Sequence, residues 1–151
     1  AAVEPLLSSL DPRNYGARAW AVRALAGIGD VRGLELLEEA LASDVGPSVR
    51  RDAACGLGRL RLAELADGER GSVRERALRG LLAGCADGEW VVRYAVAVGL
   101  ESLAQRMGPD PPQRSRLLGG LERLGDPLVE ETAVVQLRAR LALRRLLEGQ
   151  A

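Results

Sequence analysis

The chain of 151 residues has no histidine, no phenylalanine and only two cysteines. Without histidine it cannot form a Ser-His-Asp or Cys-His catalytic arrangement, a histidine metal site or the usual proton shuttle near neutral pH. Cys55 and Cys85 are far apart and form no CxxC motif, so we expect two buried apolar thiols rather than a disulfide or a metal site. These absences exclude much of ordinary enzymology.

Lysine is also absent: all 21 basic residues are arginines, and 21 acidic residues balance them. A GC-rich coding bias explains the arginines as well as a functional demand does. Because the chain has no net charge, the sequence does not indicate binding to nucleic acid irrespective of base sequence. No stretch approaches the roughly 20 apolar residues of a membrane span, and the first residues lack the basic start of a signal peptide. We therefore expect a cytoplasmic protein that binds proteins or small molecules.

One phrase recurs along the chain: an Asp followed six or seven residues later by an Arg that opens a helix. Its copies occupy residues 11–18, 44–50, 67–74 and 87–93. After each Arg the apolar residues recur with period 3.6, as Ala21, Leu25 and Ile28 do after Arg18. The Asp stands where a turn or a helix N-terminal cap is needed. No segment has the alternation of a strand. The sequence thus predicts an all-α fold, an α-solenoid of HEAT-like antiparallel helix pairs.

The spacing of these copies predicts the domain organisation. The four phrase arginines are 32, 24 and 19 residues apart, which predicts a shortened segment at 61–71. Residues 108–112 read as a rigid proline loop, and residues 126–132 as an end-capping copy with an Asp but no Arg. We expect a single HEAT-like domain over residues 1–151, without the N-terminal repeat that would precede it.

The four phrase arginines are expected to stack along one edge of the solenoid. In stacked helix pairs such an Arg reaches the Asp or the helix-end carbonyls of the adjacent repeat, which aligns neighbours. A structural role is therefore favoured over a functional one for these residues, which are Arg18, Arg50, Arg74 and Arg93.

The four aromatic residues of the chain, Tyr15, Trp20, Trp90 and Tyr94, all lie at two helix openings. One interpretation is a pair of aromatic walls that stack a flat ligand or anchor a partner. The other is that Trp20 and Trp90 fill gaps between helix pairs.

A second stripe lies off the apolar faces at spacings of three and four residues, so that its members share helix faces. On a solenoid this stripe would line the concave surface, where repeat proteins present binding groups, although ordinary solvated charge is the alternative. Its members are Trp20 with Arg23, Asp52 with Cys55 and Arg59, and Arg76 with Arg79.

Residues 14–30, 89–101 and 134–143 together resemble the E/F-type phycobilin lyases, in particular their F-type subunits. The resemblance covers most of the chain. It implies an E-type partner subunit and the transfer of an open-chain tetrapyrrole, phycocyanobilin or a related bilin, to a cysteine of a phycobiliprotein α subunit. It also implies a cytoplasm of cyanobacterial type. A related lyase-isomerase subunit uses an Asn-His-Cys-Pro motif, which a chain without histidine cannot carry.

The resemblance also suggests which residues would hold the bilin. A bilin is flat, carries two propionates and has pyrrole nitrogens that favour a nearby carboxylate, so aromatic, arginine and acidic side chains suit it. The bilin-binding candidates are Trp20, Trp90, Tyr94 and Tyr15 for stacking, Arg18, Arg23 or Arg93 for the propionates, and Asp52 or Glu89 for the pyrroles.

The thioether forms on the cysteine of the acceptor, so the chain need not supply a nucleophile, and Cys55 and Cys85 are expendable. No metal, nucleic acid or membrane is implied. The alternative function is a non-catalytic HEAT-repeat scaffold or chaperone that binds phycobiliproteins without transferring bilin.

Overall fold

The structure is a computed structural model, and it describes residues 2–8, 11, 13–108 and 112–149. These residues form eight α-helices, two short 3-10 helices and no strand. The helices are α1 (Val3–Ser8), α2 (Tyr15–Ile28), α3 (Leu34–Ser43), α4 (Pro47–Gly58), α5 (Asp67–Gly84), α6 (Trp90–Arg106), α7 (Pro112–Gly125) and α8 (Ala133–Glu148), with η1 (Val31–Gly33) and η2 (Leu62–Glu64).

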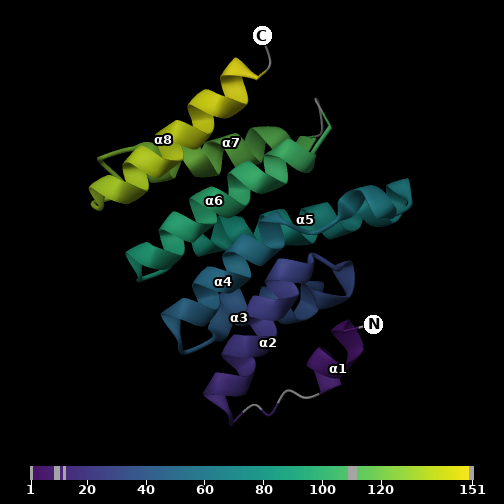
Figure 1. Cartoon of the computed structure of the whole chain (residues 1–151). Coiled ribbons are helices and arrows are strands. Elements are labelled where there is room, and N and C mark those ends of the chain that lie inside the picture. The colour runs from purple at the N-terminus through teal and green to yellow at the C-terminus, as the bar shows by residue number, and fades with distance from the viewer. Residues whose placement is uncertain (1, 9–10, 12, 109–111, 150–151) are drawn as a thin grey trace.

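The helices stack in two layers along the chain (Figure 1). Helices α2, α4, α6 and α8 contact one another in order and form what we call the even layer. Helices α3, α5 and α7 form the odd layer behind it, each packed against even helices. This arrangement confirms the all-α solenoid of antiparallel helix pairs. None of the described helices combines the length and the apolar character that a membrane span requires.

An acidic side chain makes the turn before each of the last three even helices. Asp44 Oδ1 accepts a hydrogen bond from the backbone N–H two residues further on at 2.9 Å, and Asp87 does the same at 2.9 Å. Glu130 repeats the contact at 2.8 Å. A carboxylate that holds its own loop in this way fixes the chain direction before the helix begins. The final copy of the phrase therefore uses Glu130 as its acid rather than Asp126.

The core between the layers consists of alanine, valine and leucine, and its tightest crossing joins α4 to α6. A Cβ atom added to Gly58 would lie 2.4 Å from the carbonyl oxygen of Gly99, and one added to Gly99 would lie 2.5 Å from the carbonyl oxygen of Ala54. No side chain fits between these two backbones. Glycine is therefore required at both positions of the crossing.

The copy of the phrase at residues 67–74 lies at a helix start, but the prediction that its Arg opens the helix is wrong. Helix α5 already begins at Asp67, and Arg74 lies two turns inside it, in the odd layer. The Asp67 side chain is 97% exposed and makes no turn of the kind made by Asp44. Residues 67–74 match the phrase only because any amphipathic helix can place an Asp and an Arg seven residues apart.

Without that copy, the spacing of the phrase arginines becomes 32 residues from Arg18 to Arg50 and 43 from there to Arg93. The predicted shortening at 61–71 is therefore also wrong, because those residues form η2 and the start of α5. The predicted loop at 108–112 falls mainly on residues 109–111, which lie outside the described residues. Pro112 opens α7, a position that suits proline because its nitrogen needs no partner there.

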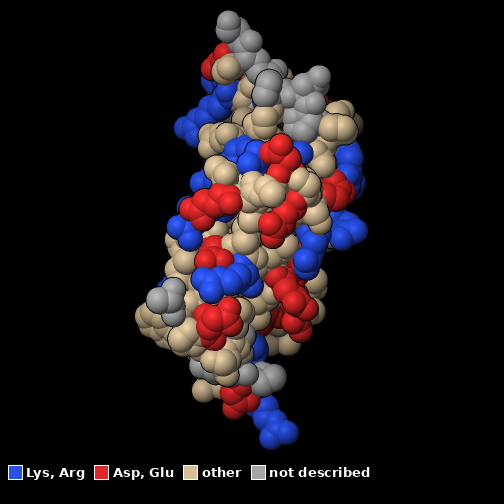
Figure 2. Space-filling model, turned by 90° about the vertical axis from the view of Figure 1, so that its right-hand side faces the viewer, with Lys and Arg blue, Asp and Glu red and all other residues tan. Residues whose placement is uncertain are grey.

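On the side of the molecule that Figure 2 shows, acidic and basic side chains are interspersed and no extended region of one sign is present. This agrees with the balanced charge of the sequence. That side of the molecule therefore lacks the concentrated positive potential that attracts a polyanion such as nucleic acid.

Candidate functional site

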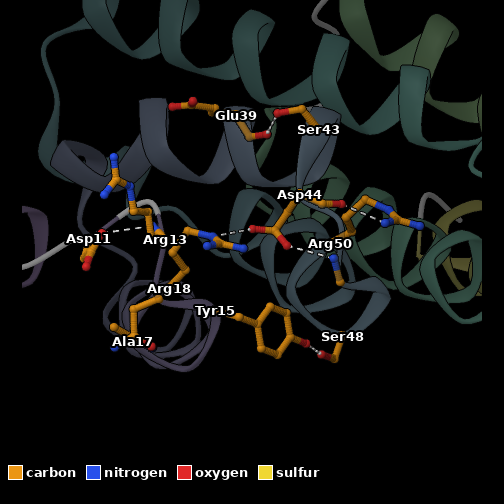
Figure 3. Close-up of polar contacts among 12 residues, drawn as sticks. Asp11, Arg13, Tyr15, Ala17, Arg18, Glu39, Ser43, Asp44, Ser48 and Arg50 are labelled. Carbon is orange, nitrogen blue, oxygen red and sulfur yellow. Dashed lines mark hydrogen bonds and ion pairs between the residues drawn. The ribbon is translucent and has the colours of Figure 1, made fainter.

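Three phrase arginines form a ladder of ion pairs along one edge of the even layer. Each Nε donates to an acid in the loop that precedes the next even helix, so each pair ties one repeat to its neighbour. The pairs are Arg18 with Asp44 at 3.0 Å, Arg50 with Asp87 at 2.8 Å and Arg93 with Glu130 at 2.6 Å. Figure 3 shows the first pair and, beside it, Arg50 donating to the backbone carbonyl of Asp44 at 2.8 Å. The predicted structural role of these arginines is confirmed.

Each arginine of the ladder is balanced by the carboxylate that it contacts. The hydrogen bond from Arg93 holds the pKa of Glu130 below its ordinary value against the opposing effect of burial. Burial tends to raise the pKa of Asp87, but the hydrogen bonds from Arg50 and from the loop outweigh it, and the pKa is lowered. Clefts of about 330 and 360 Å³ border Arg18 and Arg93 at the loop edge. Both guanidinium groups already hold a buried carboxylate, which disfavours them as propionate ligands.

Arg74 takes no part in the ladder, and the expectation that it stacks with the other three is wrong. Its Nε is buried without a hydrogen-bond partner among the described residues. The reason is its place in the middle of α5 in the odd layer, whereas the three ladder arginines lie in the first turn of even helices.

The aromatic side chains divide into tethered and free groups. Tyr15 ties α2 to α4: its hydroxyl lies 2.8 Å from Ser48 Oγ, and its ring packs so closely on Gly46 that an added Cβ would lie 2.3 Å from the ring (Figure 3). Trp20 is 72% exposed and Trp90 is 47% exposed, so the interpretation that they fill gaps between helix pairs is wrong. They are free to contact a ligand or a partner.

The outward surface of α2 and α4 is charged, and an ion pair joins the two helices across it. Arg23 Nε donates to Asp52 Oδ2 at 3.1 Å, and Arg51 lies 3.2 Å from the other carboxylate oxygen. The three arginines and one aspartate of this surface leave two net positive charges. We call it the charged face, and it consists of Trp20, Arg23, Arg51, Asp52, Cys55 and Arg59.

The members of the predicted second stripe on α2 and α4 share the charged face, but its last two members do not, and the concave position of the stripe stays a prediction. Arg76 and Arg79 lie on α5 in the odd layer, where Arg76 pairs with Glu38 of α3. The three- and four-residue spacing identifies residues on one helix face, but it does not say which layer the helix joins.

The outward surface of the first half of α6 and of α8 is apolar. Gln136 Nε2 donates to the carbonyl of Glu130 at 2.7 Å, as Arg93 donates to the carbonyl of Asp87 at 2.8 Å, so the two side chains hold equivalent positions. The residues that follow them, Tyr94 and Leu137, are therefore equivalent as well. We call this surface the apolar face, and it consists of Trp90, Tyr94 and Val98 of α6 and Val134, Leu137 and Leu141 of α8.

A buried acid that sequence reasoning missed joins α6 to α8 further along the two helices. Glu101 is only 4% exposed, and its carboxylate accepts a hydrogen bond from Arg138 and pairs with Arg145 at 3.5 Å. Nη1 of Arg138 is buried without a partner among the described residues. The signal was present in the sequence, because Glu101 is a single carboxylate inside the apolar run 95–104, and such a charge is normally paired.

Neither cysteine is prepared for catalysis. Burial raises the pKa of the Cys55 thiol, and it raises that of Cys85 to about 11. Both are free thiols that stay protonated near neutral pH, where a nucleophile would need to ionise. Glu89, the remaining candidate, is exposed in the loop before α6. No group of acidic, cysteine or histidine side chains within the described residues has the arrangement of a metal site.

Stacked helix pairs joined by a ladder of Asp and Arg residues define a HEAT-repeat α-solenoid, and the model of the HEAT repeats matches residues 1–58. The bilin biosynthesis protein RpcF of Synechococcus sp. (strain WH8020) is 50% identical over 145 residues, which are 96% of this chain and 66% of that protein. The phycocyanin alpha phycocyanobilin lyase CpcF of Synechocystis sp. (strain ATCC 27184 / PCC 6803 / Kazusa) is 52% identical over 106 residues, 70% of this chain and 50% of that protein.

A solved structure of the complex of CpcE and CpcF of phycocyanin lyase from Nostoc sp. PCC7120 also matches, with a TM-score of 0.84 and 38% identity over 93% of this chain and 79% of that one. The chain belongs to the E/F-type phycobilin lyase family, as its sequence resemblance implied. It spans between half and two thirds of the length of the two curated relatives.

Proposed function

We propose that this chain is the F-type subunit of a heterodimeric phycobilin lyase. With an E-type partner in the cytoplasm of a cyanobacterial cell, it would bind phycocyanobilin or a related bilin and promote thioether attachment to a cysteine of a phycobiliprotein α subunit. The proposal is supported by two relatives, one of which is a phycocyanobilin lyase and one of which was solved together with CpcE.

The charged face is the observation that carries the proposal. Its two net positive charges match the two propionates of a bilin, and Trp20 offers an exposed aromatic surface for a flat conjugated ring system. Asp52 holds Arg23 in place through Oδ2, and its Oδ1 accepts hydrogen bonds from Arg51, so this carboxylate orients two of the arginines. Of the nine candidate residues, Trp20, Arg23 and Asp52 therefore form the centre of the proposed bilin site.

The chemistry asks little of the side chains beyond placement. A thioether forms when the thiol of the acceptor adds across a carbon–carbon double bond of the bilin: the sulfur–carbon bond forms, the thiol proton passes to the bilin, and no group leaves. The chain contributes by holding the bilin in one geometry, since orientation alone can lower such a barrier by several kcal/mol. It also keeps competing geometries and water away from the reacting carbon.

Absorption spectroscopy tests the proposed site. The chain is mixed with phycocyanobilin, alone and with the E-type subunit, and a red-shifted, sharpened band is expected because a held bilin is extended and rigid. Trp20→Ala should weaken this band, whereas Arg79→Gln on α5 should leave it unchanged. An unchanged spectrum with both wild-type subunits present would favour the scaffold function instead.

Attachment itself is tested by co-expression of the chain with the E-type subunit, the acceptor α subunit and a source of bilin. Covalent bilin on the acceptor, scored by fluorescence of the denatured protein in a gel, is the expected result. Equal attachment without the chain would contradict the proposal.

A further inference from the structure

A cleft of about 430 Å³ lies just beyond the end of α4, where the chain turns through η2 into α5. Three arginines and one glutamate line it, so its lining carries two net positive charges. We call this site the basic cleft, and it consists of Arg61, Leu62, Ala63, Glu64, Arg70 and Arg106.

Arg70 belongs to the scaffold of the basic cleft. Its Nε donates to the carbonyl of Leu62 at 3.0 Å and its Nη2 donates to the carbonyl of Leu65 at 2.7 Å, so the side chain fixes η2 against α5. These hydrogen bonds occupy the guanidinium group and hold one wall of the cleft in place. Because the wall is already ordered, little further ordering would be needed when a ligand enters.

The other two arginines keep most of their capacity to bind an anion. Among the described residues Arg106 pairs with no carboxylate, and its Nη1 donates to the Ser102 carbonyl of its own helix at 3.0 Å. Arg61 lies 3.7 Å from Glu64 and 3.9 Å from Asp30, which is longer than a hydrogen bond, and its side chain is 50% exposed. Both guanidinium groups can therefore bind further carboxylate oxygens.

The basic cleft adjoins the charged face. Arg59, the last residue of the charged face, directly follows α4, and Arg61 comes two residues later. Arg106 ends α6, the even helix that packs beside α4. Asp52 of the charged face lies six residues before the end of α4 at Gly58, which is about 9 Å along the helix axis. A protein held in the basic cleft would therefore lie next to the proposed bilin site.

One protein in the proposed reaction has to reach the bilin site and then leave it. The acceptor α subunit must bring its cysteine to the held bilin, and it must depart once the thioether has formed. Exposed charge suits such a partner, because it speeds encounter and sets orientation without the large apolar area of a permanent complex. Two available cations match a short acidic segment of a protein rather than an extended polyanion.

We propose that the basic cleft is the docking site for an acidic segment of the acceptor α subunit, whose carboxylates pair with Arg61 and Arg106. Docking there brings the acceptor cysteine to the charged face, so the cleft promotes attachment by orienting the two reactants. The proposal rests on the proposed function for the identity of the acceptor. Arg61 and Arg106 are positioning residues in it, since neither touches the reacting carbon of the bilin.

The test uses charge reversal with a matched control. Arg61→Glu and Arg106→Glu change the basic cleft, while Arg79→Glu makes the same change at an exposed position of α5 outside it. Circular dichroism and thermal unfolding establish that each variant is folded, and Arg61→Gln and Arg106→Gln replace any variant that is not.

Two measurements follow the acceptor. Purified chain, E-type subunit and phycocyanobilin are mixed with increasing amounts of the acceptor α subunit, and the rate of covalent attachment gives KM for the acceptor and kcat, at low and at high salt. Isothermal titration calorimetry measures binding of the acceptor to the two subunits with no bilin present, so the cleft is tested even if attachment fails. The phycocyanobilin band and the affinity for the E-type subunit are recorded for every variant.

We expect Arg61→Glu and Arg106→Glu each to raise KM for the acceptor about tenfold at low salt, and to weaken its binding by a similar factor. The kcat should not change, because the variants weaken encounter and not the chemical step. High salt should shrink the difference from the wild type. The phycocyanobilin band, the affinity for the E-type subunit and the behaviour of Arg79→Glu should stay as in the wild type.

Three results would overturn the proposal. Unchanged KM and acceptor binding in both variants would show that the acceptor does not use the basic cleft. Loss of the phycocyanobilin band would assign the cleft to the bilin propionates, and weaker association with the E-type subunit would assign it to that subunit. Failure of attachment with all wild-type components would count against the proposed function, whereas acceptor binding by calorimetry would still decide the role of the cleft.

Discussion

The charged face and the apolar face lie on the same layer of the same solenoid and yet offer opposite chemistry. The residue directly after the phrase arginine is Arg51 on α4 and Tyr94 on α6. On α8, where Gln136 takes the place of the arginine, this residue is Leu137. The ladder beneath is nearly the same in each repeat. The repeat thus specifies the backbone and leaves the outward positions free, so one scaffold can present two surfaces of opposite chemistry side by side.

The largest effect is expected from breaking the ladder, which tests whether the two faces depend on it. Arg93→Met leaves Glu130 buried without its cation and should cost about 3 kcal/mol of unfolding free energy, measured by urea denaturation. The control Arg23→Met removes an exposed pair on the charged face and should cost less than about 1 kcal/mol. Equal losses would mean that the ladder does not carry the stability assigned to it.

Acid should weaken the half of the molecule under the apolar face by a smaller amount. The folded-state pKa of Glu130 and of Asp87 lies below the ordinary value, so each carboxylate contributes stability that is complete above the unfolded pKa. That stability is lost as the pH falls below about 4 toward the lower folded values. Urea midpoints measured from pH 7 to pH 3 should fall over this range, and Arg93→Met should fall less because the Glu130 contribution is already gone.

Removing one cation from the charged face should lower bilin affinity by about tenfold, equal to about 1.4 kcal/mol, without affecting stability. The variants are Arg23→Gln and Arg59→Gln, and the measurement is titration of the chain with phycocyanobilin by absorption. Arg79→Gln provides the control, because it removes the same charge from α5 in the odd layer. Equal affinity for phycocyanobilin in all three variants would show that bilin binding does not depend on the charged face.

The smallest effect is expected from the cysteines. Cys55→Ser combined with Cys85→Ser should leave covalent attachment in the co-expression assay within about twofold of wild type, because burial keeps both thiols protonated. Loss of attachment in a variant whose circular dichroism is unchanged would show that a thiol of this chain takes part in the transfer.

The helices of the solenoid could be predicted from the sequence because apolar period and turn chemistry are local. Three rungs of the ladder followed as well, since the phrase places its Asp and Arg at constant spacing. Arg74 could not be told from the true rungs, because the sequence does not reveal which layer a helix joins. The layer depends on contacts between helices, and those decide whether Arg74 meets an acidic loop.

The candidate site was predictable only in part for a related reason. Trp20, Arg23 and Asp52 share outward positions on adjacent helices, and their spacing already indicated this. The paired state of Arg18 and Arg93 and the burial of Glu101 depend on partners 26 to 44 residues away, which no local pattern specifies. The sequence placed the four aromatic residues at two helix openings, but it could not show that α4 lies between those on α2 and those on α6.

The contact between Gly58 and Gly99 lies where the half of the molecule with the charged face meets the half with the apolar face. Here two helix backbones touch, and close-packed backbone resists compression. The crossing therefore acts as a stiff mechanical joint that holds the charged face of α2 and α4 at a constant angle and distance from the apolar face of α6 and α8.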